Sequence, residues 1–391
     1  MPKLFHRDCG LLLHPSSLPN DYGIGDFGPG AHRWLEILAE HHQSLWQILP
    51  LNPAGYGDSP YQGLSAFAAN PVFLSPEHLH GLGLLADRQL AAQRLPLRRE
   101  VDYGEVYGKK AELSRSAQVA FSRLEPGHPL HQAYAAFLEK EVGWLEDFAV
   151  YSALKDRFDG VAWTDWPEPY RDREPAALDA AAAEFAGEIE RTKLEQFFLH
   201  LQWAEVKGRA GQLGIRIVGD LPIFVAHDSV DVWCQRELFR LNPDGSPSVI
   251  AGVPPDYFSK TGQLWGNPLY NWDRHREDGF AWWRRRLRKI LSWVDVVRID
   301  HFRGFEAFWE VPGGAETAAD GTWVKAPGRE VFDAFVEDYG LPLPVIAEDL
   351  GVITPEVTAL RDGFQLPGIR IMQFAFGTDP MKDTFLPESY E

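Results

Sequence analysis

The sequence has little of what builds disulfide-stabilised, membrane-spanning or nucleic-acid-binding proteins. Its 391 residues include only two cysteines, Cys9 and Cys234, which cannot form a disulfide framework and show no metal-ligand spacing. The apolar run near the amino terminus, Leu11 to Leu13, is too short for a signal peptide or a membrane span. The net charge of −18 argues against a surface for nucleic-acid phosphates. We therefore expect a soluble protein of the reducing cytoplasm, with no membrane or nucleic-acid partner and no evident obligate protein partner.

Aromatic side chains are abundant: the chain has 14 tryptophans, and aromatics make up 13% of it. Core packing is the default explanation for any single one of them. Many, however, lie in Gly- and Pro-rich segments instead of on helical stripes. Flat rings grouped in loops are typical of platforms for apolar sugar faces or for bases, and the charge disfavours bases. Examples are Tyr56, Tyr61, Tyr257, Trp265, Tyr270 and Trp272.

Strand and helix patterns alternate along the chain, and each predicted strand ends in polar or Gly-rich sequence. This alternation favours a (β/α)8 TIM barrel over a doubly wound sheet. Residues 76–211 are predicted to be a mostly helical insertion, and residues 225–275 a loop-rich one, within one barrel over 1–391. Six barrel strands are predicted, at Gly10–Leu13, Ser44–Leu49, Ile215–Val218, Val294–Ile299, Val345–Ala347 and Ile369–Phe374.

The densest basic run, Arg284 to Lys289 (RRRLRK), lies in the Trp-rich helical stretch before the fourth strand. We interpret it as a solvated helix face whose long side chains extend to water.

The stretch VDVVRIDHFRGF, from Val294 to Phe305, combines a buried β-branched strand with an abrupt group of charges. Side chains alternate along a strand, so Arg298 and Asp300 should point the same way, with the guanidinium keeping Asp300 ionised. A structural Arg–Asp pair closing a strand end is the alternative.

A second acid, Glu348, ends the next predicted strand. Two strand-end carboxylates facing each other could serve retaining glycoside chemistry, with Asp300 as nucleophile and Glu348 as the proton donor. Metal-dependent barrels also carry such pairs, so this pattern alone leaves both readings open. Asp349 should point away from the mouth of the barrel and is predicted to be structural.

Five long stretches, in order along nearly the whole chain, carry a resemblance to a known family. They are GDSPYQGLSAFAANP (57–71), GDLPIFVAHDSVDVW (219–233), GVPPDYFSKTGQLWGNPLYNW (252–272), RIDHFRGFEAFWEVP (298–312) and IAEDLGVITPEV (346–357). The sequence resembles the 4-alpha-glucanotransferases called amylomaltases or disproportionating enzymes, of the alpha-amylase clan.

The resemblance implies roles for the residues at the strand ends. Asp300 matches the nucleophile and Glu348 the acid/base. Arg298 matches the arginine that holds the nucleophile, and His301 and Asp220 match residues near the reacting sugar. For His301, a role in supporting its neighbours is the alternative.

Loop residues are matched too. Tyr61 matches an aromatic at the donor side, and Tyr56 a tyrosine of a secondary glucan site. Asp256, Gln263 and Trp265 match the loop that overhangs the glucan. Ordinary turn chemistry or packing is the alternative for each of these residues.

The implied reaction is retaining transglycosylation of α-1,4-glucans and malto-oligosaccharides, without a metal or organic cofactor. A sugar 4-hydroxyl would replace water as the acceptor, held by the aromatic and overhanging loops.

The sequence departs from the family pattern at its end. The clan's third acid follows a later strand in a THDN-type motif, which Asp379 and Asp383 do not match. We expect an incomplete barrel with two unpaired strand edges, prone to aggregation and weak in activity. A catalytically impaired glucan-binding fragment and an alpha-amylase-like hydrolase are the rival hypotheses.

Overall fold

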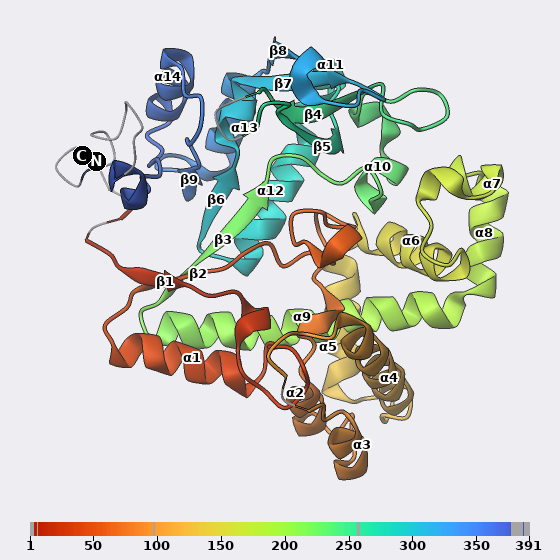
Figure 1. The fold of residues 1–391 in the computed structure, drawn as a ribbon. Helices are drawn as coiled ribbons and strands as arrows, with labels where there is room; N and C mark the ends of the chain where they lie inside the picture. Colours follow the sequence, from red (N-terminus) through yellow and green to blue (C-terminus); the bar gives the residue numbers. More distant parts are fainter. Residues whose placement is uncertain (1–3, 6, 97, 256–258, 377–385, 387–391) are drawn as a thin grey trace.

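Five parallel strands form the central sheet of the protein. The computed structural model describes residues 4–5, 7–96, 98–255, 259–376 and 386. The strand order is β1-β2-β3-β6-β9, so the strands follow one another in the sheet as they do in the sequence (Figure 1). Within the described residues the sheet stays open, with β1 and β9 at its two edges. The strands are β1 (Gly10–Leu12), β2 (Leu45–Gln47), β3 (Arg216–Pro222), β6 (Val296–Asp300) and β9 (Val345–Ala347).

Each of the first five predicted strands is confirmed, but the sixth is wrong. Over the predicted strand Ile369–Phe374 the structure has no strand, and a 3₁₀ helix, η8, spans Met372–Phe376. The backbone N–H of Ile369 bonds the Asp349 carboxylate instead of a neighbouring strand. Met372 and Phe374 stay 49% and 44% exposed. β propensity alone does not make this apolar run a strand.

Helices enclose the sheet, and most of them lie between β2 and β3. Helices α4 to α8 extend away from α13 and α14 in Figure 1, while α1 and the long α9 run side by side. The helices are α1 (Pro29–Glu40), α2 (Pro76–Gly81), α3 (Asp87–Ala92), α4 (Tyr103–Phe121), α5 (Pro129–Lys140), α6 (Leu145–Arg157), α7 (Glu168–Arg171), α8 (Pro175–Glu184), α9 (Ala186–Gln212), α10 (Val230–Cys234), α11 (Trp272–Glu277), α12 (Ala281–Trp293), α13 (Gly328–Tyr339) and α14 (Pro355–Gly363).

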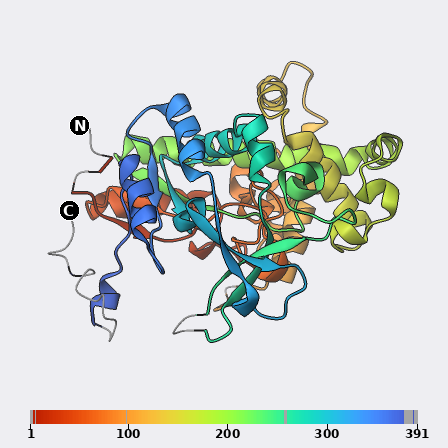
Figure 2. The same ribbon diagram turned by 90° about the horizontal axis from the view of Figure 1, so that it is seen from above.

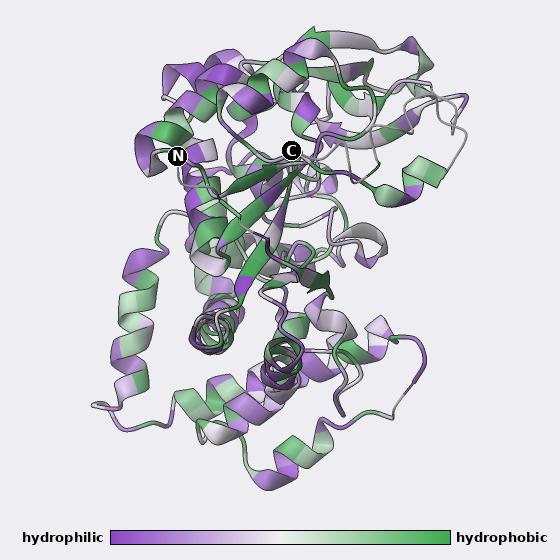
Figure 3. Cartoon of the chain, turned by 90° about the vertical axis from the view of Figure 1, so that its left-hand side faces the viewer, coloured by the Kyte–Doolittle hydropathy of each residue, from purple (hydrophilic) through white to green (hydrophobic). Residues whose placement is uncertain are grey.

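The core lies between the sheet and these helices. In Figure 3 the central strands are mostly hydrophobic, whereas the helices present mixed faces. Trp203 of α9 is buried, and its indole N–H donates to the Trp293 carbonyl at the end of α12. This contact joins the two helices that cover β3 and β6, the strands that carry most of the polar strand ends.

Helix α9 also holds the long loop that follows β2. The Gln196 side chain accepts from the Ala69 N–H and donates to the Ala69 carbonyl, both at 2.8 Å. Six residues later, the Gln202 side chain accepts from the Ser75 N–H at 2.8 Å. These buried amides satisfy backbone groups that a loop would otherwise leave unpaired. They fix the carboxyl-terminal part of the loop that carries Tyr61.

A second, antiparallel sheet, which we did not predict, includes two strands from the predicted loop-rich segment at 225–275. Its order is β5-β4-β7-β8, and Figure 2 shows it, in teal to blue, projecting away from the long helices. Two of its pairings, β4–β5 and β7–β8, join strands close in sequence, and the β4–β7 pairing joins these two hairpins across a long separation. The strands are β4 (Val249–Val253), β5 (Gln263–Pro268), β7 (Ala307–Pro312) and β8 (Thr322–Lys325).

The basic run of α12 is only partly solvated, contrary to the prediction. Arg285 and Arg288 are exposed. Arg286 is buried, and the Lys289 ammonium pairs with the buried Glu141 at 2.7 Å. The indole rings of Trp282 and Trp283 cover one side of Arg286.

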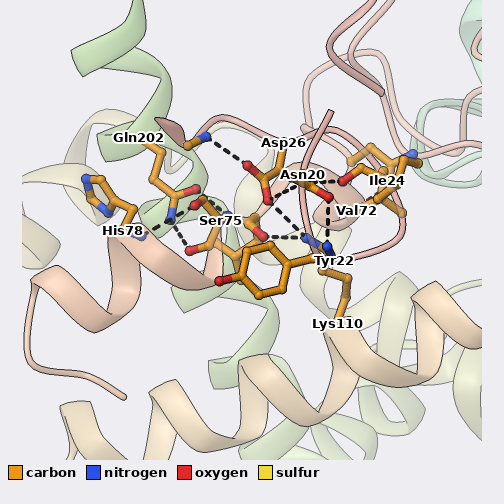
Figure 4. A network of polar contacts seen from close by, with 12 residues as sticks. Asn20, Tyr22, Ile24, Asp26, Val72, Ser75, His78, Lys110 and Gln202 are labelled. Carbon is orange, nitrogen blue, oxygen red and sulfur yellow. Dashed lines mark hydrogen bonds and ion pairs between the residues drawn. The ribbon is translucent and has the colours of Figure 1, made fainter. Parts of the chain in front are cut away.

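A buried ion pair links the loop before α1 to α4 (Figure 4). The Lys110 ammonium lies 3.8 Å from the Asp26 carboxylate, and both side chains are at most 4% exposed. Asp26 also accepts from the Gly28 N–H and the Asn20 side chain, while Lys110 donates to the Leu74 carbonyl.

No helix in the described part of the chain is long and apolar enough to cross a membrane.

Candidate active site

The register of the parallel sheet brings the predicted strand-end residues to one edge. Asp220 of β3 is the direct partner of Arg298 of β6, so both side chains point to the same face. Arg298 is in turn the partner of Ile346 of β9. Two residues further along both strands, the same register places Asp300 beside Glu348, whose N–H donates to the Ile299 carbonyl.

Arg298 bridges two carboxylates. Its Nη1 donates to Asp220 Oδ1 at 2.7 Å, and its Nη2 lies 2.8 Å from Asp300 Oδ1. Burial opposes the guanidinium charge, but the two acids outweigh it and raise the pKa of Arg298. The arginine is therefore always charged, and it fixes Asp300, which keeps 31% of its side chain exposed. The predicted same-side orientation of Arg298 and Asp300 is confirmed.

Tyr61 reaches this cluster from the loop after β2. Its hydroxyl donates to Asp220 Oδ2 at 2.6 Å, so the two oxygens of Asp220 serve two different partners. Burial raises the pKa of Asp220 to about 6, against the opposing effects of Arg298 and the Tyr61 hydroxyl. Burial and the nearby Asp220 charge raise the pKa of Tyr61, which stays a hydrogen-bond donor at neutral pH.

Glu348 occupies a different environment from Asp300. Its side chain is buried, with Oε2 accepting from the His301 N–H at 2.8 Å and Oε1 from the Leu350 N–H at 3.0 Å. Desolvation raises its pKa and the charge of Asp300 adds to this, although the two backbone N–H groups oppose it. Glu348 is thus the carboxyl of the pair better suited to carry a proton.

His301 adopts a left-handed backbone conformation, with φ of 52°, directly after β6. Such conformations in non-glycine residues cluster at functional sites. Here it directs the backbone N–H of His301 toward Glu348. Burial lowers the pKa of the His301 imidazole to about 4, so the ring is neutral at pH 7.

The second sheet supplies an aromatic wall to the site. The Trp265 ring of β5 stands edge-to-face on the His301 ring, with 4.8 Å between centroids. Gln263, on the same strand, accepts from the Trp265 indole N–H at 3.2 Å. The structure therefore places Trp265 of the predicted overhanging loop against His301, with Gln263 bonded to its indole.

The side chains of two predicted site residues lie outside the described part of the structure. Asp256 lies outside the described residues. Tyr56 begins the 3₁₀ helix Tyr56–Asp58, but its side chain lies outside the described part of the structure. Asp349 turns away from Glu348, as predicted, and binds the Arg361 guanidinium and the Ile369 N–H.

Arg286 is a residue that our sequence interpretation missed. It was assigned to a solvated face because it lies among other cations. Its spacing from Trp282, Trp283 and Ile290 nevertheless puts it on the apolar stripe of the helix, and this signal could have identified it.

The arrangement combines a partly open carboxylate bound to Arg298 with a buried carboxyl of raised pKa, flanked by aromatic rings. Acid–base and nucleophilic chemistry on a sugar requires these features. Among the described residues, no group of three or more His, Cys, Asp and Glu side chains is arranged to hold a metal ion.

Comparison with known proteins agrees with the geometry. Residues 13–391 match the 4-alpha-glucanotransferase family. The 4-alpha-glucanotransferase of Thermus thermophilus is 50% identical over 98% of this chain and 75% of its own length. That of Synechocystis sp. is 46% identical, over 98% of this chain and 76% of its own.

A solved structure shares the fold. The amylomaltase from Streptococcus agalactiae in complex with acarbose superposes with a TM-score of 0.94 at 39% identity, covering 99% of this chain and 77% of that one. The parallel sheet and its helices are thus those of an α/β, TIM-barrel-like enzyme. The chain belongs to the 4-alpha-glucanotransferase family.

Proposed function

We propose that the chain transfers α-1,4-glucan segments to the 4-hydroxyl of an acceptor sugar by retaining double displacement. The observation that carries this proposal is the contrast between Asp300 and Glu348 on adjacent strands. Asp300 is partly open and bound to Arg298, while Glu348 is buried with a raised pKa. A nucleophile must be ionised and a general acid protonated at the same pH, and these two environments favour that division.

In the first step, an Asp300 carboxylate oxygen attacks the anomeric carbon of the glucan. The glycosidic C–O bond breaks as Glu348 donates its proton to the leaving 4-oxygen. The products are a covalent glucosyl-Asp300 ester and a shortened glucan. Arg298 holds Asp300 in the orientation for attack.

In the second step, the 4-hydroxyl of an acceptor glucan occupies the place of the leaving group. The Glu348 carboxylate takes the hydroxyl proton, the acceptor oxygen attacks the anomeric carbon, and the bond to Asp300 breaks. Two inversions at one carbon give overall retention.

The surrounding side chains bind the sugar in this proposal. Asp220 accepts sugar hydroxyls beside Arg298, and His301 and Trp265 form a wall against which the ring packs. Tyr61 would contact the sugar on the donor side, and Gln263 and Asp256 would shape the path of the glucan. Tyr56 belongs to a separate glucan-contacting position.

The proposed substrates are α-1,4-glucans and malto-oligosaccharides. The family supports this substrate class, and the related Streptococcus amylomaltase was solved with acarbose. We place the reaction in the reducing cytoplasm, in keeping with two cysteines that both stay free thiols.

Incubation with maltotriose tests the proposal. We expect glucose together with maltopentaose and longer products, with the α-configuration retained. Asp300→Asn should reduce the rate by about 10⁴-fold or more, because it removes the nucleophile. Glu348→Gln should act comparably on substrates whose leaving group needs a proton.

The matched control is Asp320→Asn, which alters an exposed acid of the 3₁₀ helix Ala318–Asp320. It should leave the rate unchanged. Reducing ends without longer glucans would instead support an alpha-amylase-like hydrolase. Maltotriose binding without a turnover rate that depends on Asp300 would support a glucan-binding role alone.

A further inference from the structure

A buried arginine lies behind the strand that carries Asp220. Arg286 of α12 is 5% exposed. Its Nη2 donates to the Pro222 carbonyl at 2.6 Å, and its Nη1 donates to the Ile223 carbonyl at 3.0 Å. The two nitrogens of one guanidinium thus hold two successive carbonyls, at the point where β3 ends.

Aromatic rings complete the environment of this cation. The guanidinium carbon lies 5.2 Å and 5.3 Å from the ring centroids of Trp282 and Trp283. The Tyr270 hydroxyl, 3.4 Å from Nη1, donates to the same Ile223 carbonyl at 2.7 Å. Arg286 is therefore held by carbonyls, a hydroxyl and ring faces, whereas the neighbouring Arg284 forms surface ion pairs with two acids of α13.

The segment that Arg286 holds joins two parts of the active site. On one side, Pro222 follows Asp220 by two residues and is the register partner of Asp300. On the other, Phe224 stacks on Tyr270, with 6.0 Å between centroids, and lies 6.3 Å from the Trp265 ring. Trp265 in turn contacts His301. A shift of the 222–224 backbone would move both the Asp220 carboxylate and the aromatic wall.

We propose that Arg286 is a positioning residue for glucan transfer, which fixes the end of β3 so that Asp220 and the Trp265 wall keep their places around the sugar. This inference rests on the proposed function of Asp220 and Trp265. A buried charge is costly, and apolar replacements of buried ionic groups are often neutral or stabilising. Arg286 nevertheless satisfies two buried carbonyls and is attracted by the buried Asp231, so it also contributes to stability, and kcat measured on folded protein separates the positioning role from that contribution.

The forked geometry is the feature that matters. A lysine ammonium keeps the charge but is a single point of donation, and cannot hold two successive carbonyls in a fixed plane. Arg286→Lys therefore separates the charge of the side chain from its geometry. Arg285→Lys is the matched control, because Arg285 is the adjacent residue of the same helix and is exposed.

The first measurement is steady-state transfer from maltotriose, at a temperature where circular dichroism shows every variant folded. We expect Arg286→Lys to lower kcat by about 10- to 100-fold, as small misplacements of catalytic groups do. KM should change by no more than about twofold, since the misplaced groups act mainly in the transition state. Arg285→Lys should match the wild type. A lower melting temperature with unchanged kcat would overturn the proposal.

The second measurement is a double-mutant cycle with Tyr270→Phe. Both side chains bind the Ile223 carbonyl, so their effects on kcat should be non-additive if they act through that group. Additive effects would overturn the shared mechanism.

The third measurement is independent of activity. Crystal structures of the wild type and Arg286→Lys should show the Arg298–Asp220 contact, 2.7 Å here, lengthened or broken in the variant. Lower kcat with Asp220 and Trp265 in place would overturn the inference. If the wild type itself does not act on maltotriose, the proposed function fails, and the crystal structures alone decide the role of Arg286.

Discussion

Two buried aspartates of this protein look alike by charge and burial, yet they belong to regions with different tasks. Asp26, between the loop before α1 and α4, pairs with Lys110. Asp220, on β3, pairs with Arg298. Burial is the largest cause in both cases, and it raises the pKa of each carboxyl to about 6.

The two aspartates differ in whether their ion-pair partners have a further, more exposed acid to bind. Around Asp26 every group is used within the protein, because the carboxylate accepts from Gly28 and Asn20 while Lys110 donates to Leu74 (Figure 4). Both members of that pair are almost fully buried.

Arg298, by contrast, shares its charge between Asp220 and the more exposed Asp300. The neighbouring acid Glu348 also has a raised pKa. A raised pKa therefore does not by itself mark a functional site. The Arg298 cluster differs in that its second carboxylate, Asp300, keeps 31% of its side chain exposed.

The largest effects are expected when the same change, aspartate to asparagine, is made in both regions. Asp220→Asn should lower kcat by about 10²- to 10³-fold, since one electrostatic contact to the transition state is lost. Its free energy of unfolding should change little, because Arg298 keeps Asp300 as a partner. The measurements are maltotriose turnover and denaturant unfolding of the same preparations.

Asp26→Asn should show the opposite result. It leaves the Lys110 charge buried without a counter-ion, which costs about 3–5 kcal/mol of stability. The kcat of the folded fraction should be unchanged. If Asp26→Asn lowered kcat of the folded protein as far as Asp220→Asn does, the contrast between the regions would fail.

Much of the catalytic region was predictable from sequence, because its signals are local. The β-branched run before Asp300 predicts a buried strand, and alternation puts Arg298 and Asp300 on one side of it. Order along the chain also placed Glu348 on the adjacent strand, since β6 and β9 are neighbours in the sheet.

The errors concern features that depend on distant parts of the chain. The predicted strand Ile369–Phe374 holds a 3₁₀ helix at its end instead, and the second sheet was missed because its central pairing, β4 with β7, joins segments distant in sequence. We predicted that Arg286 is solvated because it is charged, although its position lies on the apolar stripe of the helix. Which polar group a fold buries depends on the partners that meet it, and sequence periodicity does not identify those partners.

A smaller effect is expected where the two regions differ in a single hydroxyl. Tyr61 donates to Asp220, and nothing equivalent to a tyrosine hydroxyl bonds Asp26 among its described hydrogen bonds. Tyr61→Phe should lower kcat/KM by about 10-fold, the size of one hydrogen bond to a charged group.

The same substitution should move the pH profile. Activity that needs ionised Asp220 falls as the pH drops through the pKa of that group, about 6. The Tyr61 hydrogen bond favours the ionised form, so its removal raises the pKa of Asp220 and shifts the acid limb to higher pH. An acid limb that stays in place would contradict the role given to Tyr61.

The smallest effect concerns the pH dependence of stability at Asp26. The folded-state pKa of Asp26, about 6, lies above the ordinary value of 3.8, so the folded protein binds the extra proton between these values. The contribution to stability is therefore complete below pH 3.8 and is lost as the pH rises through 6. Between pH 5.5 and 7 the loss should be about 1 kcal/mol.

The comparison that isolates this effect uses the double variant Asp26→Asn, Lys110→Met, which removes both charges and keeps the side-chain volumes. Other titrating groups, including Asp220 and the nearby Glu77, are present in both proteins, so their contributions cancel in the difference. Denaturant unfolding at pH 5.5 and pH 7 should show the wild type losing stability relative to the double variant as the pH rises. A constant difference would mean that Asp26 stays ionised throughout this range, unlike Asp220, whose pKa is raised to about 6, and the likeness drawn between the two buried aspartates would fail.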